Sequence, residues 1–216
     1  MKSEDGYKTV AHAADIELVV KKSVFLGYVM PVESEFEAQA FLAALKEQHA
    51  EARHHVYAWR IGKPGQNCVQ KFSDDGEPKG TAGLPLYNVI VKQDLTDIAI
   101  VVVRYFGGIL LGTGGLTHAY ADAAVAAVAK GQLIDMARYQ VFRFKMPYSL
   151  YTTYQKRSAL LGVKALSVTY TDEVDVEAAV LAGQRQAWED LLSDLSGGKL
   201  QATYVRDDYS SVTMNA

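Results

Sequence analysis

The sequence predicts an α+β protein of two domains, and three observations lead to this prediction. The chain has 216 residues, which exceeds a typical single domain and leaves room for two cores. Strand and helix patterns alternate around one continuous apolar run at residues 98–106. A separate β-α-β-β-α-β pattern begins near residue 138. We therefore expect domains at residues 1–137 and 138–205, followed by a polar tail at 206–216.

Composition narrows the class of protein. Hydrophobic residues make up 49% of the chain and charged residues 22%, as in a globular protein with a core. The formal net charge is -3 and neither half of the chain is polybasic, which argues against charge-driven binding to duplex nucleic acid. Cys68 is the only cysteine, so an intrachain disulfide and a cysteine-rich zinc site are excluded.

The sequence also predicts where the protein resides. Its first residues lack a basic stretch followed by an apolar core, which a secretory signal would need. No apolar run approaches the roughly 20 residues that span a bilayer. We expect a cytoplasmic protein with no membrane partner.

The first domain begins with a strand pair and a helix. Apolar runs at residues 16–20 and 24–30 flank a hinge at residues 21–23. Ser34 and Glu37 form a capping box, which predicts a helix to about residue 48. The apolar positions at helical spacing predict its buried stripe. They are Phe36, Ala40, Ala44, Phe41 and Leu45.

The rest of this domain alternates strands and helices. Residues 53–61 and 68–72 are typical of strands, and the turn signal at 73–76 follows the second. A helix starts near residue 81 or 85 and ends near 93, with Leu86, Val89 and Ile90 inward. The apolar run at 98–106 is a central strand. A last helix follows Gly115 and buries one stripe, made of Leu116, Ala119, Tyr120, Ala123 and Ala127.

The second domain follows a ferredoxin-like order. We expect a strand at residues 139–147, a helix at 149–161, strands at 163–170 and 174–181, a helix that ends at Gly197, and a strand at 200–205. This β-α-β-β-α-β succession is the ferredoxin-like pattern. The polar residues from 206 onward predict a disordered tail.

Two adjacent histidines stand on the strand at residues 53–61. Neighbouring side chains on a strand point to opposite faces, so His54 and His55 do not bind one ion without distortion. One packed and one solvated histidine is the simplest interpretation. A role for one of them at a site is the alternative.

The segment at residues 72–83 carries three carboxylates, Asp74, Asp75 and Glu77. They could hold Mg²⁺ or supply a general base, but an Asp-Asp-Gly sequence also suits a tight turn. Gly80 and Thr81 open the following helix, whose unpaired N–H groups would suit an anion.

A glycine-rich segment at residues 104–115 links the apolar strand to a helix. Its spacing matches neither the dinucleotide-binding fingerprint nor a P-loop, so its glycines serve either a tight turn or a close approach to a partner. Arg104 lies at the end of the apolar strand, where a buried guanidinium needs a counter-charge. That partner is either an internal carboxylate such as Asp74 or Asp75, or an external anion.

Three motifs together carry a resemblance to a known family. RHHVYAW, FSDDGEPKGTAG and VVVRYFGGILLGTGGLTHAYADA span residues 53–123 and resemble the IMPACT/YigZ family, in its bacterial two-domain form. The resemblance implies a ribosomal protein S5 domain 2-like fold for the first domain. It implies that the second domain is ferredoxin-like and similar to the fifth domain of elongation factor G.

The resemblance also implies a role. The family includes eukaryotic regulators of translation, which act through a protein partner and use an additional domain with no counterpart here. The two fold types stand in the same order at the ribosome-facing end of elongation factor G, which favours contact with nucleic acid or the ribosome by analogy. Many relatives have a basic residue at the position of Val24, which weakens the case for a basic strand face.

We therefore expect a binding protein rather than an enzyme, without a cofactor or a bound metal. It would contact RNA, the ribosome or a translation factor through a site for a phosphate-like anion. One alternative is a metal-dependent hydrolase or phosphotransferase that uses the three carboxylates, and another is a protein–protein interaction module. The predicted site comprises His54, His55, Asp74, Asp75, Glu77, Lys79, Gly80, Thr81, Arg104, Tyr105, Gly107, Gly108, Gly112, Thr113, Gly114 and Gly115.

Overall fold

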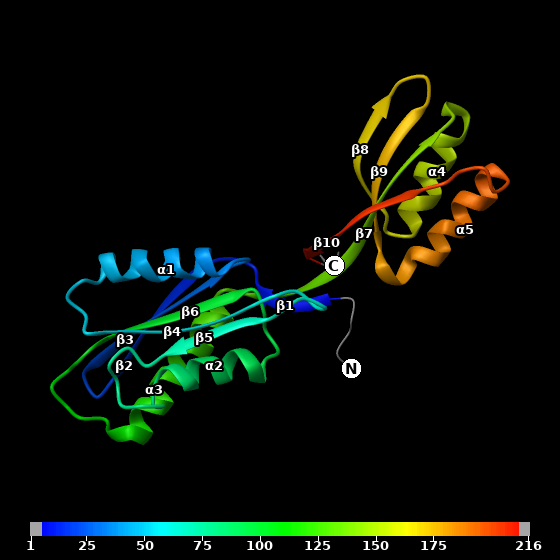
Figure 1. The fold of residues 1–216 in the computed structure, drawn as a ribbon. Helices are drawn as coiled ribbons and strands as arrows, with labels where there is room; N and C mark the ends of the chain where they lie inside the picture. Colours follow the sequence, from blue (N-terminus) through cyan, green and yellow to red (C-terminus); the bar gives the residue numbers. More distant parts are fainter. Residues whose placement is uncertain (1–5, 212–216) are drawn as a thin grey trace. The chain divides into compact units, whose positions relative to one another are not determined.

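The computed structural model describes residues 6–211, which form two compact units (Figure 1). The N-terminal unit is Tyr7–Asp135, and the C-terminal unit contains Gly6 and residues 136–211. Two strands, β1 (Gly6–Val10) and β7 (Leu133–Met146), run across this division. Both units are α+β with an antiparallel sheet, as the sequence predicts. No helix in the described part of the protein is long and apolar enough to cross a membrane.

The N-terminal unit is organised around its central strand. Its sheet has the order β2 (Ala14–Val20), β3 (Ser23–Pro31), β6 (Ile98–Tyr105), β4 (His54–Ile61) and β5 (Val69–Ser73). All residues of β6 from Ile98 to Arg104 are buried, because helices cover both faces of the sheet. Helix α1 (Glu35–Gln48) lies on one face, and α2 (Gly83–Lys92) and α3 (Gly112–Lys130) lie on the other (Figure 1). The apolar run of the sequence is thus the middle of the sheet.

Helix α1 (Glu35–Gln48) begins at the predicted cap but turns a different face to the sheet. Ser34 accepts a hydrogen bond from the Glu37 backbone N–H, while the Glu37 carboxylate accepts from the N–H of Glu33 instead of that of Ser34. Phe36 is 81% exposed. The predicted stripe is therefore wrong at Phe36, Ala40 and Ala44, which face solvent. The residues that pack on the sheet are Ala38, Phe41, Leu42 and Leu45.

The other two helices bury the stripes that the sequence predicts. Helix α2 (Gly83–Lys92) buries Leu86, Val89 and Ile90. Helix α3 (Gly112–Lys130) starts before the glycine pair that was expected to precede it, and it buries all the predicted positions from Leu116 to Ala127. Small alanines on α3 let this helix pack closely against the sheet.

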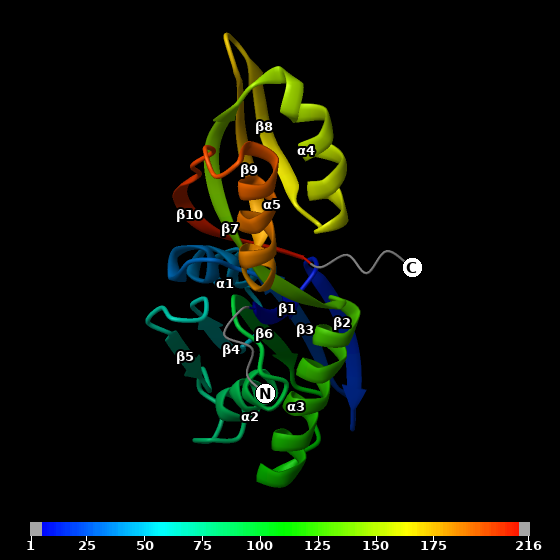
Figure 2. The ribbon, with the colours of Figure 1, turned by 90° about the vertical axis from the view of Figure 1, so that its right-hand side faces the viewer.

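The C-terminal unit has the succession β7, α4 (Tyr148–Leu160), β8 (Lys164–Tyr170), β9 (Val174–Leu181), α5 (Arg185–Ser196) and β10 (Thr203–Ser211). Its strands pair in the order β10, β7, β9 and β8. Both helices pack on the same face of this sheet (Figure 2). Trp188 of α5 is fully buried there against Phe142 and Phe144.

Three strands differ from the expectation, and one of them is β7, which begins at Leu133 instead of residue 139. Strand β1 was not predicted, and β10 continues to Ser211 through the first residues of the predicted polar tail. Backbone pairing explains β10, since it runs antiparallel along β7 with Ser211 opposite Met136 while most of its side chains stay exposed. A strand held by main-chain hydrogen bonds needs no apolar alternation. The rest of the predicted tail, residues 212–216, lies outside the described residues.

The side of α1 that packs on the sheet leads to a prediction about stability. Leu45→Ala should lower the free energy of unfolding of the N-terminal unit by about 2–5 kcal/mol, because this side chain is only 4% exposed. Phe36→Ala should change it by less than about 0.5 kcal/mol. Hydrogen exchange of the β6 amides measures both changes in the N-terminal unit. Equal effects of the two substitutions would contradict the observed face.

Candidate functional site

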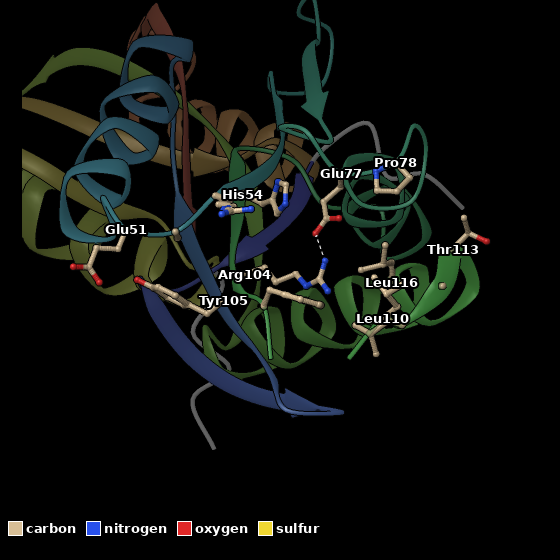
Figure 3. Close-up of a pocket in the computed structure, with 14 residues that line it drawn as sticks. Glu51, His54, Glu77, Pro78, Arg104, Tyr105, Leu110, Thr113 and Leu116 are labelled. Atoms are coloured by element: carbon tan, nitrogen blue, oxygen red, sulfur yellow. Dashed lines mark hydrogen bonds and ion pairs between the residues drawn. The ribbon is translucent and has the colours of Figure 1, made fainter. Parts of the chain in front are cut away.

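The N-terminal unit carries a pocket of about 690 Å³. Four segments form it: the connection from α1 to β4, the connection from β5 to α2, the end of β6, and the start of α3 with the loop before it (Figure 3). The pocket is lined by Glu51, Ala52, Arg53, His54, Glu77, Pro78, Arg104, Tyr105, Phe106, Leu110, Leu111, Gly112, Thr113 and Leu116.

A buried ion pair lies in this pocket. Arg104 Nη1 donates to Glu77 Oε1 at 2.7 Å, and the two side chains are only 7% and 3% exposed (Figure 3). The hydroxyl of Tyr120 donates to the same carboxylate oxygen at 2.8 Å. Burial and the neighbouring Glu77 carboxylate raise the pKa of Tyr120 far above its ordinary value, so this hydroxyl stays a donor.

This ion pair corrects the sequence-based expectation for Arg104. The guanidinium meets its counter-charge inside the protein, and the partner is Glu77 rather than Asp74 or Asp75. An external anion is therefore not required to compensate its charge. Because Glu77 already neutralises Arg104, the main reason to expect an RNA phosphate site centred on this arginine is gone.

One donor of Arg104 nevertheless remains unpaired. Its Nη2 lies 3.5 Å from the hydroxyl of Ser23, which is a weak contact. Among residues 6–211, no acceptor lies within hydrogen-bond distance of its buried Nε. The guanidinium carbon lies 5.5 Å from the ring centroid of Phe25 and 5.6 Å from that of Phe106, so aromatic contacts hold the group in place.

Asp74 occupies the helix N-terminus that the sequence suggested for an external anion. Its carboxylate accepts hydrogen bonds from the backbone N–H groups of Gly80, Ala82 and Gly83 at 2.8, 3.0 and 2.8 Å. Burial opposes ionisation of Asp74, but these three donors outweigh it and lower the pKa of the carboxyl group. The hydroxyl of Thr81 donates to the carbonyl of Pro78 within the same turn. The start of α2 is thus closed by the protein itself.

Asp75 has another structural task. Its Oδ2 accepts from the backbone N–H of His55 at 2.6 Å, and Lys46 lies 3.7 Å from its Oδ1. Asp74, Asp75 and Glu77 therefore engage three different sets of protein donors. Across the described residues 6–211, no group of three His, Cys, Asp or Glu side chains could hold a metal ion. The three carboxylates therefore do not converge on one point in the structure.

The two histidines point to opposite faces, as their strand position predicts. His55 is buried, its Nε2 donates to the carbonyl of His49, and burial lowers its pKa. His54 lines the pocket, and its Nδ1 lies 2.9 Å from the backbone carbonyl of Asp75. Since a carbonyl only accepts, this contact places a proton on Nδ1 of His54.

The glycine-rich loop turns large apolar side chains outward. A Cβ on Gly107 would lie 2.0 Å from the backbone carbon of Lys22, so only glycine fits beside the turn between β2 and β3. Gly108 and Gly112 have φ angles of +82° and +70°, which favour glycine. Between them, Leu110 is 84% exposed. The glycines thus shape the loop that forms one wall of the pocket.

Only part of the predicted site lies at the pocket. His54, Glu77, Arg104, Tyr105, Gly112 and Thr113 line it. The other predicted residues do not, namely His55, Asp74, Asp75, Lys79, Gly80, Thr81, Gly107, Gly108, Gly114 and Gly115. Sequence reasoning missed the apolar wall of Pro78, Phe106, Leu110, Leu111 and Leu116, and it missed Tyr120 as the second donor to Glu77. The apolar residues 109–111, which follow Gly107 and Gly108, are the sequence signal that could have indicated this wall.

Two arginines on the strands of the C-terminal sheet pair with carboxylates of β9. Arg143 on β7 makes two hydrogen bonds to Asp175 on β9, at 3.0 and 2.8 Å. Arg206 on β10 pairs with Glu177 on β9 at 2.8 Å. These cross-strand pairs balance their own charges.

Comparisons with known proteins agree on one family. The Impact N-terminal domain matches residues 21–128. The IMPACT family member YvyE of Bacillus subtilis is 33% identical over 90% of this chain and 88% of its own length. The IMPACT family member YigZ of Escherichia coli is 34% identical over 90% of this chain and 97% of its own length. A crystal structure of a hypothetical protein has a TM-score of 0.63 and 30% identity, covering 94% of this chain and 98% of that one.

The buried ion pair makes a prediction about stability. Glu77→Leu should lower the free energy of unfolding of the N-terminal unit by about 3–5 kcal/mol, because Arg104 would be left buried without a counter-charge. The double variant Glu77→Leu, Arg104→Met should recover most of that loss, since no buried charge remains. Hydrogen exchange of β6 amides measures both. A double variant as unstable as the single one would show that the charges are not the cause.

The capping role of Asp74 makes a prediction about pH. Its pKa is lowered in the folded protein, so its contribution is present above the unfolded-state pKa of about 3.9 and is lost as pH falls through the folded-state pKa. Asp74→Asn should lower stability near neutral pH by about 1–3 kcal/mol, and the two proteins should converge as the pH falls. The control is Asp122→Asn on exposed α3 surface. Parallel acid unfolding curves for wild type and Asp74→Asn would contradict the assignment.

Proposed function

The chain belongs to the IMPACT family, and from this membership we propose that it is a non-catalytic binding protein in translation or its regulation. One observation carries the binding part of the proposal. The pocket joins an exposed apolar wall to an internally paired Arg104–Glu77 floor, while Asp74 and Asp75 are engaged elsewhere by backbone donors. Such a surface offers contacts for a partner, and the predicted carboxylates Asp74, Asp75 and Glu77 are all engaged by protein donors.

The translation part rests on the family. Its eukaryotic members regulate translation through a protein partner, as the sequence resemblance implies. We propose that this protein contacts the ribosome or a translation factor in the cytoplasm, with the pocket of the N-terminal unit as the contact site. Direct binding of RNA phosphate is the weaker version of this proposal. The donors expected to bind the phosphate already bind carboxylates of the protein, since Glu77 binds Arg104 and Asp74 binds the start of α2.

We also propose specific fold assignments for the two units. The strand order β10, β7, β9, β8 with two helices on one face supports a ferredoxin-like fold for the C-terminal unit. The family membership supports a ribosomal protein S5 domain 2-like fold for the N-terminal unit. We place the domain boundary between Asp135 and Met136, close to the residue 137 that the sequence favoured.

Sedimentation with purified ribosomes and translation factors tests the proposal. Wild-type protein should co-sediment with ribosomes or be captured by a translation factor. The variant Leu110→Ser should lose about tenfold in affinity, because it removes an exposed apolar contact without disturbing the core. Phe36→Ser is the matched control, since Phe36 is 81% exposed and lies outside the pocket.

The outcomes separate the versions of the proposal. Loss of wild-type binding after RNase treatment would favour contact through RNA, and retention would favour a protein partner. Wild-type protein that binds neither ribosomes nor translation factors would refute the proposed function. Equal binding by wild type and the pocket variant would refute the pocket as the contact site.

A further inference from the structure

We propose that the pocket of the N-terminal unit binds a peptide segment of a partner protein that carries a carboxylate next to a large apolar side chain. This inference rests on the proposed function in one respect, namely that the pocket is a binding site. It adds the chemical class of the ligand and the groups that recognise it.

The first requirement is an apolar group on the ligand. Leu110 and Phe106 are 84% and 57% exposed, and they stand at the wall that Leu111, Leu116 and Pro78 continue. Figure 3 shows Leu110 and Leu116 on the same side of the ion pair, at the start of α3. When a partner covers exposed aliphatic groups, the complex is stabilised by about 25 cal/mol per Å² of buried apolar area. A leucine-like side chain fits this wall.

The second requirement is a negative group. The helices of the N-terminal unit differ at their first turns. Ser34 caps α1, and Asp74 binds the backbone N–H groups at the start of α2. Helix α3 has no side-chain cap and no acidic residue in its first turn. Leu111 stands at the α3 cap position, where its side chain offers no acceptor. Gly112 and Thr113, the first residues of α3, line the pocket. The unpaired N–H groups there favour an anion.

A separate observation places a further donor at the same pocket. Arg104 lines the pocket and its side chain is 7% exposed, yet its Nε finds no acceptor among the described residues. A buried donor without a partner costs free energy, and a ligand acceptor recovers it where binding displaces the side chains that enclose this Nε. Glu77 balances the charge of the guanidinium, so the ligand needs to supply an acceptor rather than a large negative charge.

The balance of charges favours a peptide over a nucleic acid. Glu51 and Glu77 line the pocket together with Arg53 and Arg104, so the formal charges of these four residues cancel. Single-stranded nucleic acid is typically held by a positively charged groove with several stacking rings. Here the wall is mainly aliphatic, and a single carboxylate meets the N-terminus of α3 without the repulsion that a row of phosphates would meet.

Titration of the full-length protein with short synthetic peptides tests the inference. The first probe is N-acetyl-Gly-Ser-Gly-Leu-Leu with a free C-terminal carboxylate, and the second is the same peptide with an amidated C-terminus. The third is N-acetyl-Gly-Ser-Leu-Leu-Asp amide, which carries its carboxylate on a side chain. Amide NMR spectra at about millimolar peptide should show shifts at Thr113, Gly114 and Gly115 for the two acidic peptides, with the neutral peptide bound about tenfold more weakly.

The acidic probes also distinguish the source of the carboxylate. Stronger binding of the free acid identifies the C-terminus of a partner protein as the ligand, and stronger binding of the third peptide identifies an acidic side chain. Equal affinity for the neutral and acidic peptides would overturn the inference. Tighter binding of oligouridylate than of either acidic peptide at the same amides would overturn it in favour of RNA.

Two variants with a matched control add a second line of evidence. Thr113→Asp places a competing carboxylate in the first turn of α3, so it should raise the melting temperature slightly and weaken the acidic peptides about tenfold. His118→Asp adds an acidic group at an exposed position later in α3, outside the pocket, and should bind like wild type. Leu110→Ser should weaken all three peptides. Wild-type affinity in Thr113→Asp would overturn the inference, whatever the fold does.

These results separate the two proposals. Peptide binding by a protein that associates with neither ribosomes nor translation factors would refute the role in translation and keep the ligand assignment. Ribosome or factor binding that Thr113→Asp leaves intact, together with no peptide preference, would refute the ligand assignment alone.

Discussion

The burial of one positive charge constrains the whole N-terminal unit. Arg104 lies near the end of a strand that is otherwise apolar along its buried length, so its charge has to be met within the protein. Glu77 meets it from the β5–α2 connection, and Tyr120 of α3 donates to the same oxygen. One carboxylate therefore joins the central strand, a loop and a helix. The pocket is built around this junction, so the chemistry it presents follows from how the charge is neutralised.

Periodicity predicted the elements well where a side-chain pattern decides the structure. The β6 run and the α3 stripe are apolar because both are buried, and both were found as predicted. The pattern failed on α1, whose sequence offers two overlapping apolar stripes, and the sheet accepts the one that contains Leu45. It failed on β10 for a different reason, because that strand is held by main-chain hydrogen bonds and carries exposed polar side chains.

The need of Arg104 for a partner was predictable, but the identity of the partner was not. Three carboxylates lie within four residues, and the turn decides where each one points. Asp75 and Gly76 adopt φ angles of +45° and +87°, which send Asp74 to the start of α2, Asp75 to the edge of β4 and Glu77 to β6. The pocket itself escaped prediction, because four segments far apart in the sequence form it.

The same turn bears on how the protein ages chemically. An aspartate followed by glycine tends to cyclise to a succinimide, because the glycine amide nitrogen attacks the side-chain carboxyl with little steric hindrance. Asp75 precedes Gly76, yet its carboxylate is held at 2.6 Å by the backbone N–H of His55 and faces Lys46. Cyclisation would have to break those contacts first. The folded unit thereby protects a dipeptide that would degrade in an unfolded polypeptide.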